Sequence, residues 1–287
     1  MKEKQIKTNY NYRLNKLKED STCKLNWLFL PGGPGMGANY LIDFVSKLEL
    51  QGSMFVGDFP GDGDNRDFPK GGDNRNNEEI SYYNWKEGLI EVVNKLKPCI
   101  LVTHSFSGMF ALTIGDLENL LTGLVIINSA PNSSWIELIK DTATKYNLPD
   151  LTDDINELYK NPTDEQLKTF FYANIPYIFC EHEISEGKKI LELCSYSITT
   201  RLWANQNFYN SYKYSWIPNK LPTLIIGSRD DKLLPIKLFL ENTEWSQPHP
   251  NINIIELHNT GHFPWLSCFT QINEELSGLT KDINELL

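Results

Sequence analysis

The sequence predicts an α/β fold: a mostly parallel sheet covered by helices on both faces, with an inserted helical cap. Short apolar runs of strand length alternate with longer stretches that carry apolar residues at helical spacing. This alternation stops between Pro131 and Pro218, where amphipathic helical stretches and many aromatic residues occur without a convincing buried strand. A chain of 287 residues is long enough to form one compact core of this class with such an insertion.

Six runs are predicted to be strands because they are rich in Val, Ile, Leu or aromatic residues and are bounded by turn residues. They are residues 27–30, 54–57, 100–103, 124–128, 223–227 and 252–257. The polar stretch before them is expected to add one or two edge strands. Two sets of apolar residues keep helical spacing and predict helices that cover the sheet. They are Trp85, Leu89, Val92, Val93 and Leu96, and Ile272, Leu276, Leu279, Ile283 and Leu286.

These patterns divide the chain into a core of residues 1–130 and 219–287 and a helical cap of residues 131–218. The insertion begins just after one predicted core strand and ends just before another, as a lid over one edge of the sheet would. The alternative is a separate interaction domain. A polar run from Asp62 to Glu79 is expected to be a surface loop. It does not match a calcium-binding loop, because Arg66 and Asp67 occupy positions where the EF-hand pattern needs an oxygen ligand and a glycine.

The charge of the chain argues against a nucleic-acid partner. Its formal net charge is −10 and its pI is near 5.1, whereas binding to a phosphate backbone depends on clustered Lys and Arg. The longest apolar runs are too short to cross a bilayer, so no membrane span is expected. A small-molecule substrate fits this composition best, and the oligomeric state is left open.

The N-terminal residues and the cysteines bear on the expected location. The N-terminal segment, residues 1–7, is rich in charged residues and no apolar segment follows it, so it does not predict a secretory signal. The five cysteines are scattered and contain no CxxC pair, which indicates neither a disulfide framework nor a zinc site. We therefore expect reduced thiols, a cytoplasmic location, and no metal or other cofactor.

Ser105 is the candidate nucleophile. It lies between a predicted strand and the helical stretch 108–114, in the sequence Thr-His-Ser-Phe-Ser-Gly, as expected for a sharp strand-to-helix turn that exposes a serine hydroxyl. The usual motif has glycine two residues before and after the serine, whereas this chain has Thr103 and Ser107, both still small. Taken alone, such a serine is more often an ordinary helix N-cap than a nucleophile.

A serine needs an imidazole base and a carboxylate that orients it. The strand at 223–227 runs into Asp230 and Asp231. The position after the strand favours Asp230 as the acid, whereas the distance from Pro235 favours Asp231. We predict Asp230, because the end of the strand fixes geometry more tightly than the loop that follows. His262 lies in a loop after the last strand, beside a glycine, and follows both the serine and the acid in the chain. The chain order serine, acid, histidine is the one that accompanies a nucleophilic serine at a strand-to-helix turn.

A glycine-rich loop follows the first core strand and offers backbone N–H groups for an oxyanion. Gly33 N–H and Phe106 N–H, the latter next to Ser105, are the expected pair. The same loop, residues 33–38, loosely fits the dinucleotide fingerprint Gly-x-Gly-x-x-Gly/Ala, with Asp58 as a ribose partner. That alternative leaves the serine, the acid and the histidine unexplained.

Taken together, these motifs resemble those of the α/β-hydrolase superfamily over essentially the whole chain, with the insertion where capped members carry a lid. Residues 32–35 (Gly-Gly-Pro-Gly) are similar to the His-Gly-Gly-Pro-Gly oxyanion loop of the proline iminopeptidase-like branch, with Pro31 in place of the histidine. Residues 58–63 resemble the Asp-x-Pro-Gly-x-Gly turn of many esterases rather than the Asp-Gln-Arg-Gly of iminopeptidases. The resemblance implies catalytic roles for Ser105, Asp230 and His262.

The sequence thus predicts a serine hydrolase that cleaves a small ester, thioester or amide through an acyl-Ser105 intermediate, with the insertion selecting the substrate. One alternative is a proline iminopeptidase-like aminopeptidase, in which a carboxylate of the insertion would hold the substrate ammonium. The candidates for that carboxylate are Glu181, Glu183 and Glu186. A second alternative is a non-catalytic binding protein of the same fold, and a third is a cofactor-free lyase that uses the same serine and histidine.

Overall fold

The computed structural model describes residues 6–66, 82 and 84–286. In this part of the chain an eight-stranded sheet has the order β1-β2-β4-β3-β5-β6-β7-β8. The strands are β1 (Ile6–Lys7), β2 (Arg13–Lys18), β3 (Asn26–Leu30), β4 (Ser53–Asp58), β5 (Cys99–His104), β6 (Gly123–Ile127), β7 (Thr223–Ser228) and β8 (Ile252–Leu257). β2 pairs antiparallel with β1 and β4, and every pair from β4 to β8 is parallel. The predicted fold class and all six predicted strands are confirmed.

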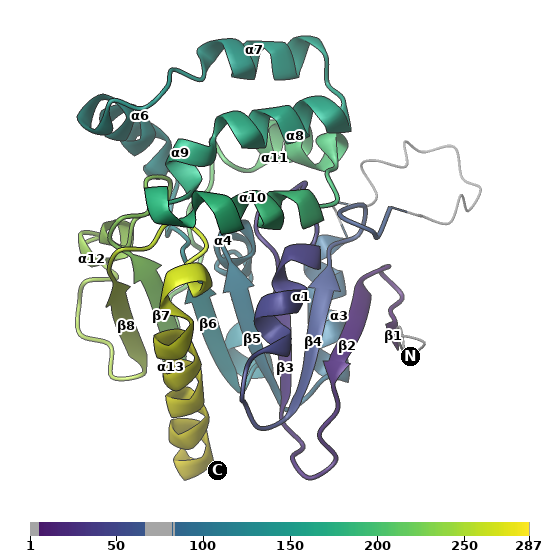
Figure 1. Ribbon diagram of the computed structural model, residues 1–287. Helices are drawn as coiled ribbons and strands as arrows, with labels where there is room; N and C mark the ends of the chain where they lie inside the picture. Colours follow the sequence, from purple (N-terminus) through teal and green to yellow (C-terminus); the bar gives the residue numbers. More distant parts are fainter. Residues whose placement is uncertain (1–5, 67–81, 83, 287) are drawn as a thin grey trace.

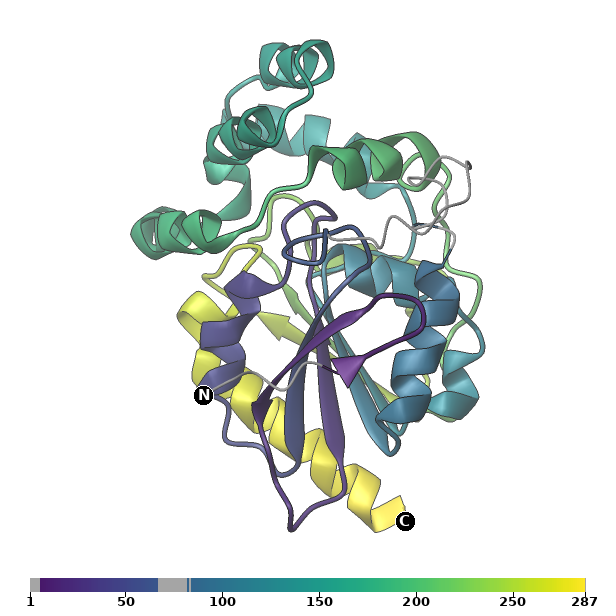
Figure 2. The same ribbon diagram turned by 90° about the vertical axis from the view of Figure 1, so that its right-hand side faces the viewer.

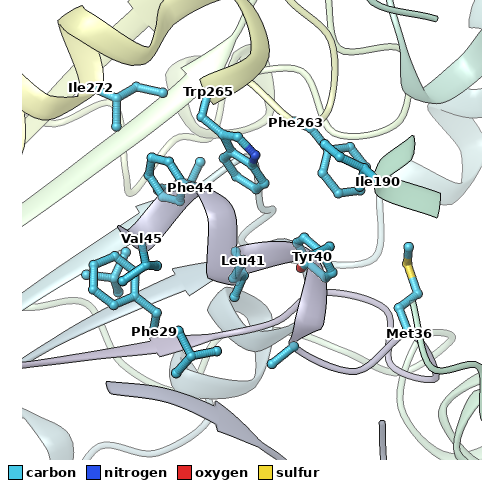
Figure 3. Packing of buried hydrophobic residues seen from close by; sticks show 14 of the residues in the cluster. Phe29, Met36, Tyr40, Leu41, Phe44, Val45, Ile190, Phe263, Trp265 and Ile272 are labelled. Atoms are coloured by element: carbon cyan, nitrogen blue, oxygen red, sulfur yellow. The ribbon is translucent and has the colours of Figure 1, made fainter. Parts of the chain in front are cut away.

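Helices cover both faces of this sheet (Figures 1 and 2). One face carries α1 (Asn39–Ser46) and α13 (Trp265–Leu286), and the other carries α3 (Trp85–Lys95), α4 (Phe106–Ala111) and α5 (Leu117–Leu120). Because side chains alternate along a strand, Phe29 of β3 packs into the first layer and Leu28 into the second. Figure 3 shows the first layer, in which Phe44 of α1 stacks on Trp265 at a ring distance of 4.7 Å. The last helix begins at Trp265, earlier than the apolar spacing from residue 272 indicated.

The segment between β6 and β7 is helical and lies over one edge of the sheet (Figure 1). It contains α6 (Trp135–Tyr146), α7 (Thr152–Lys160), α8 (Asp164–Ala173), α9 (Ile175–Ile178), the 3₁₀ turn η1 (Glu181–Glu183), α10 (Ile184–Leu193) and α11 (Ile198–Asn207). Its two ends meet, because Tyr214 N–H donates to Pro131 O over 2.9 Å and Asn132 forms a bridge with Lys213. We call residues 135–207 the helical layer.

The parallel register determines where chemistry can occur. Thr103 pairs with Leu30, Ile127 with His104, and Ser228 with Leu257, so the carboxyl ends of neighbouring strands share one edge. The loops that follow β3, β5, β7 and β8 therefore emerge together beneath the helical layer, as expected for ligand sites of α/β sheets. No helix in the described ranges combines the length and apolar character that crossing a membrane requires.

Candidate active site

Ser105 lies at a strained turn between β5 and α4. Its backbone angles are φ 56° and ψ −117°, in a region that residues other than glycine rarely adopt. The turn lies directly against the loop after β3, since a Cβ built on Gly32 would be 2.7 Å from the Ser105 Cβ. Glycine at position 32 therefore allows the loop to approach the serine.

The two residues that replace the usual glycines are accommodated by hydrogen bonds. The Thr103 hydroxyl donates to Val125 O over 2.8 Å within the sheet. The Ser107 hydroxyl accepts from His104 N–H at 3.0 Å and lies 3.0 Å from the carbonyl of Leu30, to which it donates. Both polar side chains are fully buried but satisfied, so the altered motif still forms the turn.

Ser105, His262 and an aspartate form one hydrogen-bonded line. Ser105 Oγ is 3.0 Å from His262 Nε2, and His262 Nδ1 is 2.7 Å from Asp231 Oδ2. The other carboxylate oxygen of Asp231 accepts the N–H groups of Leu233 and Leu234 at 2.8 and 3.0 Å. Since a carboxylate oxygen accepts, Nδ1 carries the ring proton and Nε2 is free to accept the proton of the serine.

The acid in this line is Asp231, which corrects the prediction of Asp230. Asp230 is half-buried, and its carboxylate accepts Asn259 N–H at 2.8 Å instead. The chain leaves β7 at Ser228 and turns, so that Asp231 is 2% exposed and faces the histidine. The spacing from Pro235, which favoured Asp231, was the better guide.

His104 connects the serine turn with the histidine loop. Its Nε2 lies 2.9 Å from the carbonyl of His262, which only accepts, so Nε2 carries the proton and Nδ1 accepts from Tyr40 O–H at 2.8 Å. The Tyr40 oxygen in turn accepts Gly32 N–H at 2.6 Å. Burial, with the nearby His262 ring as the second cause, holds the pKa of His104 well below its usual value. The neutral ring thus ties the glycine loop to the His262 backbone, a role that the sequence pattern did not indicate.

The candidate oxyanion donors border this site. Gly33 has φ +113° and lies in the loop next to Ser105, and Phe106 is the first residue of α4. In the described part of the chain neither N–H has a hydrogen-bond acceptor. The Gly33 carbonyl is held from the helical layer side, because Tyr209 O–H and Arg201 Nη1 both donate to it. Both amides are thus available to an oxyanion above Ser105.

Two buried carboxylates hold the glycine loop from below. Asp62 Oδ2 accepts Gly35 N–H at 3.1 Å, and Asp58 Oδ1 accepts Ala38 N–H at 2.7 Å. Asp62 is fully buried, so the prediction that residues 62–79 form a surface loop is wrong at its first residue. Residues 67–79 of that run lie outside the described residues. The loop amides at Gly35 and Ala38 are already bonded and Asp58 is only 2% exposed, which argues against a dinucleotide site here.

The buried Asp58 makes the stability of the fold depend on pH. Burial raises its pKa to about 7, the Asp62 carboxylate adds to this rise, and Arg13 opposes it. The folded protein therefore holds this proton more tightly than the unfolded chain, where the value is 3.8, and stability falls as pH rises from about 4 to about 7. Between pH 5 and pH 8 the free energy of unfolding of the wild type should fall by about 2 to 3 kcal/mol relative to that of Asp58→Asn, because the asparagine has no proton to lose. Urea unfolding at both pH values measures this, with exposed Asp43→Asn as the control; equal pH dependence in wild type and Asp58→Asn would refute it.

Glu183 of η1 supports the histidine loop from the helical layer. Although only 3% exposed, its carboxylate accepts four hydrogen bonds. The donors are Thr260 Oγ1 at 2.7 Å, Ser267 Oγ at 2.6 Å, Gly261 N at 2.9 Å and Cys180 N at 2.9 Å. Glu183 is thus fully engaged, and Glu181 and Glu186 are exposed. None of the three carboxylates proposed to hold a substrate ammonium lines the cavity described below.

Removal of the Glu183 carboxylate is expected to destabilise the protein strongly. Glu183→Ala leaves buried N–H and O–H groups without acceptors, and we expect a loss of about 3 kcal/mol in the free energy of unfolding. Glu183→Gln should lose less than half of this, because its amide oxygen can accept the two N–H groups while its NH₂ donates to the two hydroxyls. Chemical denaturation measures both, and Glu186→Ala provides an exposed control on the same segment. Equal losses for the alanine and glutamine variants would contradict this account.

A cavity of about 320 Å³ opens above Ser105, between the sheet edge and the helical layer. Ser105, His262 and Gly33 form its floor, and apolar side chains of α6, α7 and α8 form a large part of its wall. Its volume is within the range of small-molecule pockets. In the described part of the chain no Asp, Glu or Lys lines it, and Arg201 is its one permanently charged side chain.

Comparisons with known proteins agree with this architecture. The family model described as "Alpha/beta hydrolase family" matches residues 27–275. Among solved structures, a proline iminopeptidase-related protein from Thermus thermophilus superposes with a TM-score of 0.73 at 16% identity, covering 100% of both chains. An alpha/beta fold family hydrolase from Bacillus anthracis gives 0.67 at 16% identity, covering 98% of both chains.

A thermophilic esterase from Thermogutta terrifontis gives a TM-score of 0.66 at 15% identity, covering 99% of this chain and 98% of that one. No curated protein sequence matches this chain. The structural likenesses concern the fold, whereas the family model spans most of the sequence. The chain therefore belongs to the alpha/beta hydrolase family.

Proposed function

We propose that this protein is a serine hydrolase that cleaves a small ester, thioester or amide through an acyl-enzyme on Ser105. The observation that carries the proposal is the line from Ser105 Oγ through His262 to Asp231, with distances of 3.0 and 2.7 Å, at the floor of an apolar cavity. A serine hydroxyl becomes a useful nucleophile only with such a base and its orienting carboxylate.

The reaction then proceeds in two halves. Ser105 Oγ attacks the acyl carbon while His262 Nε2 takes the hydroxyl proton, and the N–H groups of Gly33 and Phe106 stabilise the oxyanion. When the intermediate collapses, the bond to the leaving group breaks and His262 returns the proton to that group. A water molecule then attacks the acyl-Ser105 ester with His262 again as base, which releases the carboxylic acid and restores the serine.

We further propose that residues 131–218 act as a cap that selects the substrate. This is supported by the cavity wall, since α6, α7 and α8 all contribute apolar side chains to the cavity above the serine. An iminopeptidase-like activity is less well supported, because it requires a carboxylate for the substrate ammonium and no carboxylate among the described residues lines the cavity. A non-catalytic role is disfavoured because the altered motif still brings Ser105 against His262.

Covalent labelling tests the proposal. A fluorophosphonate probe should label the wild-type protein to completion and leave Ser105→Ala unlabelled, because the probe reacts only with an activated serine. Ser129→Ala is a suitable control, since Ser129 is buried beside the turn and its hydroxyl donates to the backbone carbonyl of Ser105, over 2.8 Å, rather than to a side chain of the site. Absence of labelling in a folded wild-type protein, or labelling that survives in Ser105→Ala, would reject the proposal.

A further inference from the structure

Arg201 of α11 lines the apolar cavity and forms no ion pair with any residue that the structure describes. Its guanidinium lies between two aromatic rings, 5.8 Å from the centre of Phe171 and 5.3 Å from that of Tyr209. Nη1 donates to Gly33 O over 3.2 Å. Within residues 6–66, 82 and 84–286, no carboxylate lies within ion-pair distance of this side chain.

The guanidinium edge opposite Nη1 has unused hydrogen-bonding capacity. Its Nε–H is buried and finds no acceptor in the described part of the chain. A buried N–H of a charged group without an acceptor is costly, so such a group normally has a partner when the protein is functional. Tyr209 and Gly33 occupy the other side. Nε and Nη2 form the edge that carboxylates bind in a bidentate manner. Nε is closed off from the cavity, so a carboxylate reaches this edge through Nη2 and pairs with Nε as well only when the guanidinium rotates.

The location of Arg201 restricts what that partner can be. The cavity contains no competing acidic side chain among the described residues, and its remaining wall is largely apolar. Since Nη1 reaches the carbonyl of Gly33, the guanidinium lies close to the expected oxyanion site. An anion bound there would belong to the substrate itself, near the carbonyl that Ser105 attacks.

We infer that Arg201 is a substrate-specificity residue that binds a free carboxylate on the acyl part of the substrate. The inference rests on the proposed function and narrows it to half-esters or half-amides of dicarboxylic acids. The apolar wall of the cavity contacts the chain between the two carbonyl carbons, and Arg201 pairs with the free end. A positively charged substrate, such as one with an amino terminus, is repelled by the same group.

Arg201 also has a structural contact, which the experiment must separate from binding. Both Arg201 and Tyr209 donate to Gly33 O, so loss of either side chain loosens the glycine loop for every substrate. Tyr209→Phe is therefore the matched control: it removes a donor to the same carbonyl but keeps the cation. Burial raises the pKa of Tyr209 to about 12, so its hydroxyl remains a donor across the assay range.

The experiment compares matched substrates. Monoethyl succinate, glutarate and adipate are assayed against neutral ethyl esters in which an isopropyl group replaces the carboxylate, such as ethyl 5-methylhexanoate for the glutarate. We expect wild type to prefer at least one half-ester by 10-fold or more in kcat/KM. Arg201→Met should abolish this preference through a higher KM for the half-ester, Arg201→Lys should retain part of it, and Tyr209→Phe should lower kcat on both substrates and leave the ratio unchanged.

The outcomes separate the inference from the proposed function. If Ser105 reacts with the fluorophosphonate but wild type prefers none of the three half-esters, the inference is overturned and the hydrolase proposal stands. If Arg201→Met lowers kcat/KM equally for the half-ester and for the neutral ester, Arg201 only supports the glycine loop and the inference is likewise overturned. If the serine is unreactive, the binding of the three half-esters to Ser105→Ala is measured by calorimetry. Binding that is lost when Arg201→Met is added supports a carboxylate site at Arg201. Absence of binding overturns the inference.

Discussion

Asp231→Asn is expected to lower kcat/KM for ester hydrolysis by about 10⁴-fold, whereas Asp230→Asn should remain within about threefold of wild type. The asparagine amide can donate to His262 Nδ1, which places the ring proton on Nε2 and leaves no lone pair to accept the proton of Ser105. Asp230 has no such role, and an asparagine there can still accept Asn259 N–H through its amide oxygen. The same substitution at two adjacent aspartates should thus change kcat/KM by amounts that differ by orders of magnitude.

The comparison is made by steady-state kinetics and by the rate of fluorophosphonate labelling. Both variants should unfold at urea concentrations close to that of wild type, because asparagine is nearly isosteric with aspartate. The labelling rate should fall with kcat/KM in Asp231→Asn, since both depend on activation of Ser105. A large loss in Asp230→Asn, or near wild-type activity in Asp231→Asn, would show that the 2.7 Å contact is not the functional one.

The core of the fold was predictable because each strand carries its own local signal. The run 99–102 is continuously apolar and the stretch 85–96 is periodic, so pattern and length identified them as parts of the strand β5 and the helix α3. Ser105 was found as the residue that directly follows a strand, and His262 as a residue of the loop after the last strand. Parallel strands place their carboxyl ends at one edge, and this rule brought together residues 157 positions apart.

The choice between Asp230 and Asp231 was beyond the sequence pattern. After a strand ends, side-chain direction depends on the φ and ψ of each turn residue, and a difference of one residue reverses which carboxylate faces inward. The two N–H groups of Leu233 and Leu234 that hold Asp231 belong to the turn and have no signature of their own. The proline four residues later was the one available indication.

Buried polar groups on different segments were also missed. Glu183 resembled a solvated helix face, but its partners Thr260 and Ser267 are about eighty residues away. Asp62 resembled the start of a surface loop, but its partner is the glycine loop 27 residues earlier. Polar residues that pair across long distances in the chain show no sequence period. Their residue type alone therefore predicts that they are exposed, although the tertiary structure buries them and supplies their hydrogen-bond partners.

Gly33→Ala is expected to lower kcat by about 10² to 10³-fold with little change in KM. Gly33 has φ +113°, which an alanine cannot adopt without strain, and its Cβ would lie 3.0 Å from Gly35 N. Relief of this strain rotates the Gly33 N–H away from the position above Ser105. Since an oxyanion donor acts mainly on charge that develops in the transition state, the loss should fall on kcat rather than on substrate binding.

The glycine loop has other anchors that make this variant interpretable. Gly35 and Ala38 N–H groups remain held by Asp62 and Asp58, so the change should stay local and the free energy of unfolding should fall by less than the loss in transition-state binding. Gly278→Ala in α13, where an added Cβ meets nothing within 4 Å, is the matched substitution without a catalytic consequence. If Gly33→Ala folds and keeps kcat within threefold of wild type, the N–H of Gly33 is not an oxyanion donor. Stabilisation of the intermediate would then fall on Phe106 N–H and on a group outside the glycine loop.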